Sequence, residues 1–169
     1  HPFLAGRVID EACFSGGGGV PGAQGLCPSP DGSRASGAGA AAPCTGVDMC
    51  GHGTHVAGIV AGSGGPPSAP SGVAPGASIL AVQVFTKVID PDECGGPTVT
   101  PCLIAFDADL LEALEWVRAA RLDRHPSLVA VNLSLGSPSF GDCRADPLAP
   151  AIDALDAAGV AVVAASGNW

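Results

Sequence analysis

Two histidines in a glycine-rich stretch are the residues of this chain best suited to chemistry. Residues 51–58 read GHGTHVAG, which places His52 between two glycines and His55 three positions later. The glycines permit a sharp turn and a close approach of other groups, and the small residues after them favour a helix packed tightly against a sheet. We therefore expect His52 at the start of a helix, with its imidazole in a cleft. An imidazole with a pKa of about 6.5 can accept and donate a proton near neutral pH.

Zinc binding is the alternative chemistry for these histidines. His52 and His55 would share one helix face, and Cys50 precedes them, so the three residues offer donors that zinc accepts. The glutamate of the His-Glu-x-x-His pattern is absent, however, and Cys50 lies in cysteine-rich loop sequence. We expect no metal site here. His55 is expected to be structural and to pack beneath the site.

The composition indicates one globular domain with few kinds of partner. The chain has 169 residues, of which 47% are hydrophobic and 14% charged, enough for a single core. A net charge of −9 with only seven Lys and Arg argues against nucleic-acid binding. No uninterrupted apolar stretch reaches the roughly 18 residues of a membrane span.

Seven cysteines indicate disulfides and an oxidising, extracellular compartment. Six of them lie in loop-like sequence rich in Gly, Pro and Ser, where free thiols have no evident structural use. Proximity along the chain favours the pairs Cys13–Cys27, Cys44–Cys50 and Cys94–Cys102. Cys143 has no partner nearby, and the odd number predicts a partner outside these 169 residues.

The hydrophobic pattern alternates between strands and helices. Strands are expected at residues 6–10, 79–85, 128–133 and 160–165, with 79–85 buried on both faces and 128–133 also buried. Helices are expected at 52–61, from Asp107 and from Asp146 to Gly159. The helix from Asp107 should bury Leu110, Leu111, Leu114, Val117 and Leu122. Residues 15–49 and 86–104 are expected to be loops. This order predicts an α/β fold whose functional groups gather beyond the carboxyl ends of parallel strands.

Four segments resemble those of the subtilisin-like serine proteases, the subtilases. They are GHGTHVAG at 51–58, GVAPGA at 72–77, NLSLG at 132–136 and AASGN at 164–168, in the family's order. The resemblance implies a subtilisin-like three-layer α/β fold with a mostly parallel central sheet flanked by helices, here incomplete. Residues 1–169 would then be part of one peptidase domain, with a Gly/Ala/Pro-rich, disulfide-tied loop at about 15–49.

The resemblance also implies roles for particular residues. His52 would be the general base and acid of a Ser-His-Asp triad, and Asn168 would donate its side-chain amide to the oxyanion. The remaining predicted site residues bind substrate: Ser134, Leu135 and Gly136 as a strand edge for an extended peptide, and Ala165, Ser166 and Gly167 as a wall of the specificity pocket.

Two triad members do not match this sequence. No segment resembles the family's Gly-Thr-Ser-Met-Ala nucleophile motif, so the serine is expected beyond Trp169. Asp10 ends a strand-like run, but Glu11 and Ala12 follow it where the family has Ser or Thr and then Gly. The His1-Pro2 pair resembles one that follows the family's aspartate. We therefore expect the triad aspartate upstream of His1, with Asp10 as the alternative; Asp10 would then be a surface residue.

The expected function is peptide-bond hydrolysis by a secreted serine endopeptidase, of which this chain is a fragment that is inactive alone. The expected partners are peptide or protein substrates bound as an extended strand. We expect no cofactor: residues 62–76 contain no Asp or Glu, and the acidic run 90–93 is expected to be solvated, with calcium binding as the alternative. The alternative function is a non-catalytic, subtilase-like binding domain. Asp followed by Ser or Thr and Gly upstream, and the serine motif downstream, would favour the enzyme.

Overall fold

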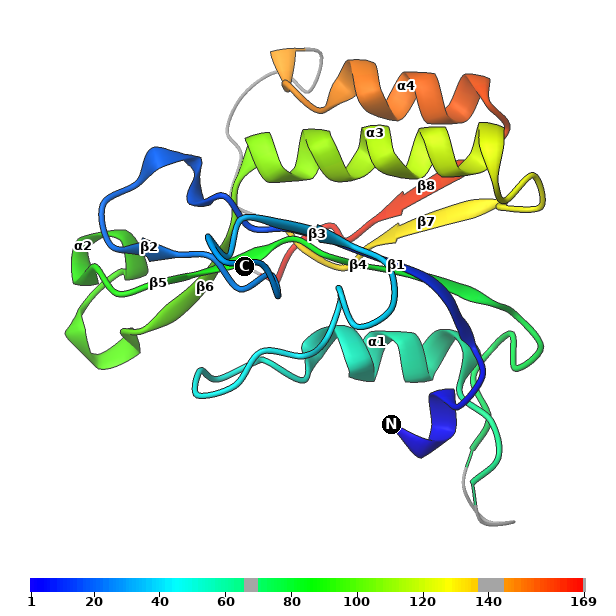
Figure 1. Cartoon of the computed structure of the whole chain (residues 1–169), viewed down its shortest axis with the longest axis horizontal. Coiled ribbons are helices and arrows are strands. Elements are labelled where there is room, and N and C mark those ends of the chain that lie inside the picture. The colour runs from blue at the N-terminus through cyan, green and yellow to red at the C-terminus, as the bar shows by residue number, and fades with distance from the viewer. Residues whose placement is uncertain (66–69, 137–144, 169) are drawn as a thin grey trace.

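The computed structural model describes residues 1–65, 70–136 and 145–168, which form strands with helices on both sides (Figure 1). The strands are β1 (Val8–Phe14), β2 (Ala23–Gln24), β3 (Arg34–Ser36), β4 (Ile79–Gln83), β5 (Phe85–Val88), β6 (Cys102–Ala105), β7 (Ala130–Leu133) and β8 (Ala161–Ala164). The α-helices are α1 (His52–Ala61), α2 (Pro91–Cys94), α3 (Asp107–Asp123) and α4 (Ala149–Ala157), and short 3-10 helices span Pro2–Leu4, Gly17–Gly19 and Pro97–Val99.

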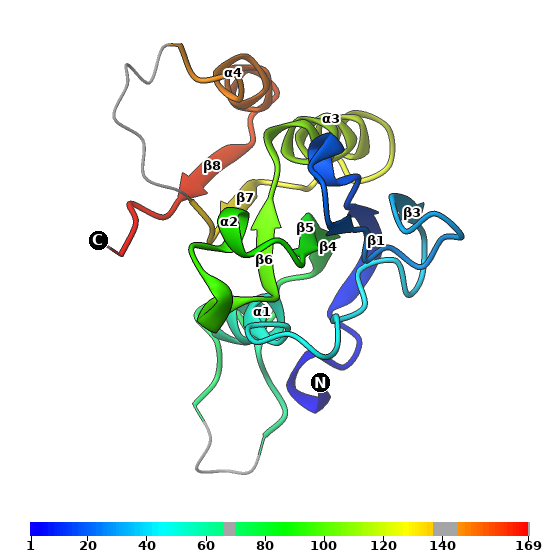
Figure 2. The same cartoon turned by 90° about the vertical axis from the view of Figure 1, so that its left-hand side faces the viewer.

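Two parallel strand pairs make up the centre of the molecule. β1 pairs with β4 from Val8↔Ile79 onward, and β7 pairs with β8 up to Leu133↔Ala164. Helices α3 and α4 lie on one side of these strands and α1 lies on the other (Figures 1 and 2). The predicted α/β architecture with parallel strands flanked by helices is confirmed.

Helix α3 connects the two strand pairs through its apolar face. Leu110 and Ala113 pack in one buried cluster with residues of β1, whereas Leu114 and Val117 pack in a second cluster with residues of α4. Val82 of β4 contacts both clusters. Full burial of one such side chain stabilises a fold by about 1.5–3 kcal/mol. Leu122 was expected on this face but is exposed, because twelve residues carry it about a third of a turn away from Leu110.

The strands of the β7–β8 pair are less buried than their sequence indicates. We expected the strand at 128–133 to be buried, yet Val129, just before β7, is 71% exposed, and Val163 of the neighbouring β8 is 59% exposed. Val131 and Leu133 contact the cluster under α3 and α4, so one face is covered and the other is open. A continuous apolar run indicates a strand but does not reveal whether a second layer covers it.

The predicted strand 79–85 is divided between two sheets. It breaks at Val84: β4 pairs with β1, whereas β5 pairs antiparallel with β6 from Phe85↔Ala105 to Val88↔Cys102. The expectation of a loop at 86–104 was therefore wrong. Thr86 and Val88 alternate as buried positions of a real strand.

The Gly-rich segment 15–49 was expected to be a surface loop. That expectation failed to include two short strands, β2 and β3. β3 pairs antiparallel with β1, and β2 pairs antiparallel with β5. Both add to strands that are already formed, so neither needs a strong pattern of its own.

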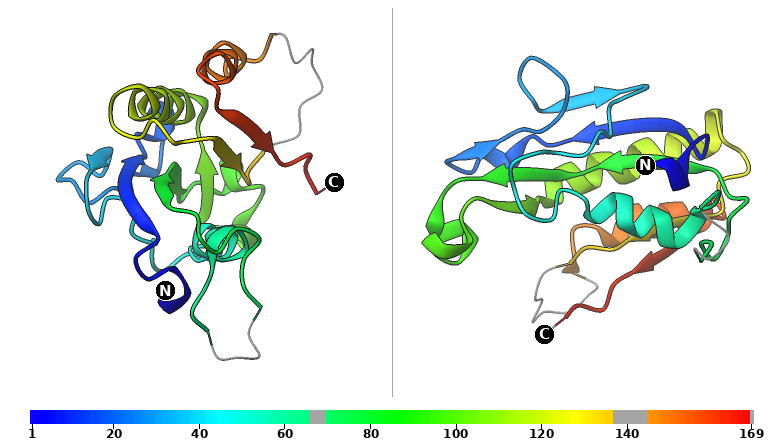
Figure 3. Two further views of the ribbon diagram at one scale, coloured as in Figure 1. Left: turned by 90° about the vertical axis from the view of Figure 1, so that its right-hand side faces the viewer. Right: turned by 90° about the horizontal axis from the view of Figure 1, so that it is seen from below.

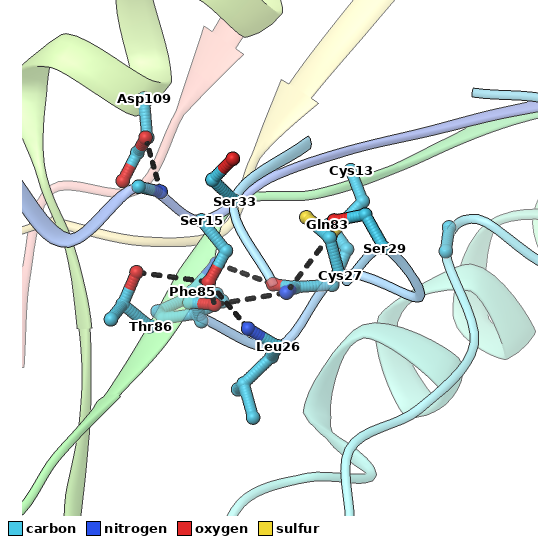
Figure 4. The surroundings of a disulfide bond; sticks show 12 residues. Cys13, Ser15, Leu26, Cys27, Ser29, Ser33, Gln83, Phe85, Thr86 and Asp109 are labelled. Atoms are coloured by element: carbon cyan, nitrogen blue, oxygen red, sulfur yellow. Dashed lines mark hydrogen bonds between the residues drawn. A yellow bond between two sulfur atoms is a disulfide. The ribbon is translucent and has the colours of Figure 1, made fainter. Parts of the chain in front are cut away.

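A polar network at the end of β1 orders the start of this segment (Figure 4). The hydroxyl of Ser15 donates to the carbonyl of Phe85 at 2.9 Å and accepts from the N–H of Leu26 at 2.9 Å. It also lies 3.0 Å from the Thr86 hydroxyl. The adjacent Cys13–Cys27 disulfide is buried.

All three disulfides expected from proximity are present. They are Cys13–Cys27, Cys44–Cys50 and Cys94–Cys102. The statement about Cys143 falls outside the described residues.

Asp109 in the first turn of α3 has a different role from the one its position suggests. An acidic residue there usually faces water and favours the helix dipole, but Asp109 is only 5% exposed. Its carboxylate accepts from the N–H of Gly16 at 2.8 Å and of Gly17 at 3.2 Å. Gly16 is right-handed and Gly17 left-handed at φ +73°, and successive N–H groups of such a pair converge on an anion.

We predict that Asp109→Ala lowers the free energy of unfolding by about 1–3 kcal/mol, because two N–H groups at a buried position lose a charged acceptor. Urea unfolding followed by circular dichroism measures this. The matched control is Asp107→Ala: Asp107 is exposed in the same helical turn, and its loss should cost at most about 0.5 kcal/mol. Equal losses in the two variants would contradict the role of Asp109.

Candidate functional site

The segments predicted to carry the site all lie beyond the carboxyl ends of the central parallel strands. Helix α1 begins at the end where β4, β7 and β8 finish (Figures 1 and 3). His52 is the first residue of α1, Ser134–Gly136 follow β7 directly, and Ala165–Asn168 follow β8 directly. Loop groups at the carboxyl ends of parallel strands are the usual position of an α/β active site.

His52 lies at the exposed start of α1. Gly51 precedes it as the capping residue and supplies no side-chain hydrogen bond. The His52 N–H donates instead to the carbonyl of Met49 at 2.8 Å, which closes a turn before the helix. The His52 ring is half-buried and makes no hydrogen bond with a residue that the structure describes. Its nitrogens can therefore exchange a proton with a group brought to them.

The segment after β7 has a fixed side chain and an open backbone. Leu135 packs against the cluster formed by β1 and α3, and the Ser134 hydroxyl accepts from the side-chain amide of Asn132 at 2.8 Å. Within the described ranges, no hydrogen bond uses the backbone of Ser134, Leu135 or Gly136. Such an edge can pair with an extended peptide.

The segment after β8 starts beside the last residue of β7. The N–H of Ala165 donates to the carbonyl of Leu133 at 3.1 Å, which continues the pairing beyond β8. Gly167 has φ +97°, a conformation that favours glycine, and Asn168 follows it with an exposed side chain. The oxyanion candidate therefore follows a residue with left-handed backbone conformation. Trp169 lies outside the described residues.

The structure counts against the zinc alternative and places His55 differently from the expectation. The Cys50 sulfur is bonded to Cys44, so it is not a thiolate ligand. His55 is exposed, not packed beneath the site, and its N–H donates to Gly51 at 3.0 Å.

The described ranges contain no group of three or more His, Cys, Asp or Glu residues arranged to hold a metal ion. In the acidic run 90–93, Asp90 caps α2 by accepting from the N–H of Asp92 at 2.9 Å.

Among the helices of the described part of the chain, none is long and apolar enough to cross a bilayer.

Asp10, the alternative triad acid, lies in a cluster of its own that the sequence did not reveal. Its carboxylate is 3.0 Å from Nε2 of His125 and 3.2 Å from a guanidinium nitrogen of Arg124. The Arg124 guanidinium also lies over the Trp116 ring at 5.2 Å. Asp10 and His125 are thus partly buried partners, whereas Asp10 was expected to be a surface residue. More than a hundred positions separate them, and no local pattern connects residues so far apart.

The electrostatics of this cluster favour an ionised Asp10. Burial alone would raise the pKa of the Asp10 carboxyl, but hydrogen bonds from His125, from the Glu11 backbone and from Arg124 outweigh it and hold that pKa below its ordinary value. The cluster ties β1 to the carboxyl end of α3.

A shallow groove of about 360 Å³ between β3 and α3 contains none of the predicted site residues. Phe14 and Trp116 line it together with Glu112 and Glu115. Arg34 lies over the Phe14 ring at 5.8 Å and is ion-paired with Glu112. A cation of this chain, Arg34, therefore forms part of the groove wall.

Comparison with known proteins identifies relatives of one kind. The model of the Subtilase family matches residues 30–169. Subtilisin DY of Bacillus licheniformis is 34% identical over 122 residues, which cover 72% of this chain and 35% of that protein. Serine protease AprX of Bacillus subtilis (strain 168) is 33% identical over 125 residues, covering 72% of this chain and 25% of its own length. The CO(2)-response secreted protease of Arabidopsis thaliana is 31% identical over 129 residues, covering 72% of this chain and 14% of its own. The chain thus spans about a third or less of these relatives. No solved structure matches significantly.

The Asp10 cluster predicts acid-sensitive stability. A carboxyl with a lowered folded-state pKa stabilises the fold above its unfolded-state pKa, and this contribution disappears as the pH falls through the lowered value. Asp10→Asn should therefore reduce the free energy of unfolding by about 1 kcal/mol at about pH 6 and by much less at about pH 2.5. Urea unfolding at the two pH values measures the difference.

Asp153→Asn is the control for Asp10→Asn, because Asp153 is an exposed aspartate of α4 without an ion pair to any described residue. It should change stability little at either pH. An effect of Asp10→Asn that stays the same at both pH values would show that its charge is not what ties β1 to α3.

Proposed function

The chain belongs to the subtilase family, and we propose on that premise that it supplies the histidine, one oxyanion donor and part of the substrate cleft of a serine endopeptidase. One observation carries this proposal: α1, which starts with His52, begins at the end of the central strands where β7 and β8 finish and where the segments 134–136 and 165–168 follow them (Figure 1). The relatives named as serine protease and subtilisin support it.

In this proposal His52 moves the proton. Its imidazole accepts the proton of a serine hydroxyl as that oxygen attacks the peptide carbonyl, and then gives it to the leaving amine. A position at a glycine-preceded helix start, with the ring half-exposed and not hydrogen-bonded to a described residue, suits this task.

The serine and the aspartate of the triad would come from outside these 169 residues. The engagement of Asp10 by Arg124 and His125 supports an aspartate upstream of His1 as the third member. A carboxylate already held by two cationic or polar partners is poorly available to orient a further imidazole.

Asn168 is the proposed oxyanion donor. When the serine attacks, negative charge develops on the former carbonyl oxygen, and a fixed amide N–H directed at that oxygen stabilises it. Gly167, left-handed and beyond the end of β8 at Ala164, stands immediately before Asn168, which supports a side chain turned away from the strand direction.

The substrate would bind as an extended peptide along Ser134–Gly136, with Ala165–Gly167 forming a wall of the specificity pocket. The inward packing of Leu135 anchors this edge and leaves the backbone groups to the peptide. We place the protein outside the cell, because three disulfides persist in oxidising compartments and one relative is named a secreted protease.

We predict that His52→Ala, made in the longer protein that contains this chain, lowers kcat/KM for peptide hydrolysis by at least about 10³-fold and abolishes labelling by a fluorophosphonate probe. His55→Ala is the matched control: it lies on the same helix, is exposed, and should change kcat/KM by less than about threefold. Labelling by the fluorophosphonate probe that persists in His52→Ala would contradict the proposed role of His52.

Asn168→Ala in the same protein should lower kcat by about 10²–10³-fold with little change in KM, because the lost hydrogen bond forms fully only in the transition state.

The 169-residue chain alone should hydrolyse no peptide. Hydrolysis by the pure chain that Ser134→Ala removes would contradict the assignment of Ser134 to binding. The alternative, a non-catalytic binding domain, would be supported if the longer protein contains a serine motif and binds extended peptides but is never labelled by the fluorophosphonate probe.

A further inference from the structure

The turn immediately before His52 contains an unfavourable backbone conformation. Met49 has φ +70° and is, within the described ranges, the one residue other than glycine in the left-handed region. For a side chain such as methionine this conformation is disfavoured by about tenfold or more. The Met49 side chain is 66% exposed, so its own packing does not hold it there.

The Cys44–Cys50 disulfide is the constraint next to this residue. It closes the chain six positions apart and ends one residue after Met49. Upstream, Ala40 is buried beside the Cys13–Cys27 disulfide, and the N–H of Ala41 donates to the Glu11 carboxylate at 3.1 Å. From residue 43 to Cys50, no backbone N–H donates a hydrogen bond to any described residue. The disulfide is thus the main internal restraint on this segment.

The carbonyl of Met49 connects this turn to the histidine. It accepts the His52 N–H at 2.8 Å, while Gly51 offers no side chain that could cap the helix. The direction of the Met49 carbonyl depends on its left-handed backbone. A change in the backbone conformation of Met49 would therefore move the carbonyl that accepts the hydrogen bond from the first residue of α1.

We propose that the Cys44–Cys50 disulfide, by holding Met49 in the left-handed conformation, is a redox-sensitive positioning element for His52. Its significance for catalysis rests on the proposed function, but its effect on the turn does not. Cys44, Met49 and Cys50 act through His52 and touch no reacting atom.

A dithiol reductant is the chemical signal to which this element responds. A thiolate of the reductant attacks one sulfur, the Cys44–Cys50 bond breaks, and the mixed disulfide resolves as the reductant closes its own disulfide. Two electrons and two protons pass to Cys44 and Cys50, which both become thiols. Cys44 and Cys50 are partly exposed, whereas Cys13 and Cys27 are buried, so reagent reaches the turn first. Cys94–Cys102 is also partly exposed and needs its own control.

Hydrogen exchange of the His52 amide tests the proposal on this chain directly. In Cys44→Ser/Cys50→Ser we expect this amide to exchange about tenfold faster or more, because the Met49 carbonyl leaves its position. The imidazole signals of His52 should shift in the NMR spectrum. Cys94→Ser/Cys102→Ser removes a disulfide of similar loop length on α2 and β6 and should change neither readout.

Rescue by glycine separates positioning from general loosening of the loop. Glycine adopts φ +70° without penalty, so Met49→Gly added to Cys44→Ser/Cys50→Ser should restore slow exchange at least in part. In the oxidised chain, Met49→Gly should change nothing, because the side chain is exposed. Unchanged His52 exchange after loss of the disulfide, or faster exchange still after Met49→Gly, would overturn the proposal.

Kinetics of the longer protein keep this inference separate from the proposed function. If both hold, Cys44→Ser/Cys50→Ser lowers kcat and leaves KM nearly unchanged. If His52→Ala leaves activity intact, the proposed function fails while the exchange result still decides the role of the disulfide.

Discussion

The burial of one face of α3 is the interaction on which the rest of this structure depends. That face covers the β1–β4 pair through Leu110 and Ala113 and reaches the β7–β8 pair and α4 through Leu114 and Val117. The sheets contain no hydrogen-bonded ladder from β4 to β7 within the described residues. Side-chain packing under α3 therefore sets the spacing between the strands whose ends carry the proposed site.

Polar contacts at both ends of α3 fix its position along β1. Asp109 binds the N–H groups of Gly16 and Gly17 just after β1, and Arg124 and His125 hold Asp10 near its start. The fifteen helical steps from residue 109 to residue 124 span about 22 Å, and the six steps along the strand from residue 10 to residue 16 span about 20 Å. The helix and strand are thus matched in length, so both contacts form together. Apolar packing alone would tolerate sliding, whereas two buried or half-buried carboxylates with specific donors do not.

The sequence was informative where a local pattern corresponds to a local structure. Leu110 to Val117 at helical spacing, the start of α1 at His52 and the three short-range disulfides could all be predicted. The sequence was uninformative where a structural feature depends on residues far away along the chain. β3 exists because β1 offers an edge, and the Asp10–His125 contact joins elements more than a hundred positions apart. The family motifs named the candidate site residues, but only the fold shows that two of these segments follow neighbouring, paired strands, β7 and β8.

The start of α1 shows why a histidine proposed to act in catalysis at this position needs support from outside the helix. Serine, threonine, aspartate or asparagine at residue 51 would accept an N–H of the first turn and hold the helix start by itself. Glycine there keeps the approach to His52 open but supplies no such acceptor. The nearest acceptor is the Met49 carbonyl, which is correctly directed only in a conformation that methionine does not prefer. A covalent link between Cys44 and Cys50 replaces the absent cap, because it restricts the turn without adding a side chain in front of the imidazole.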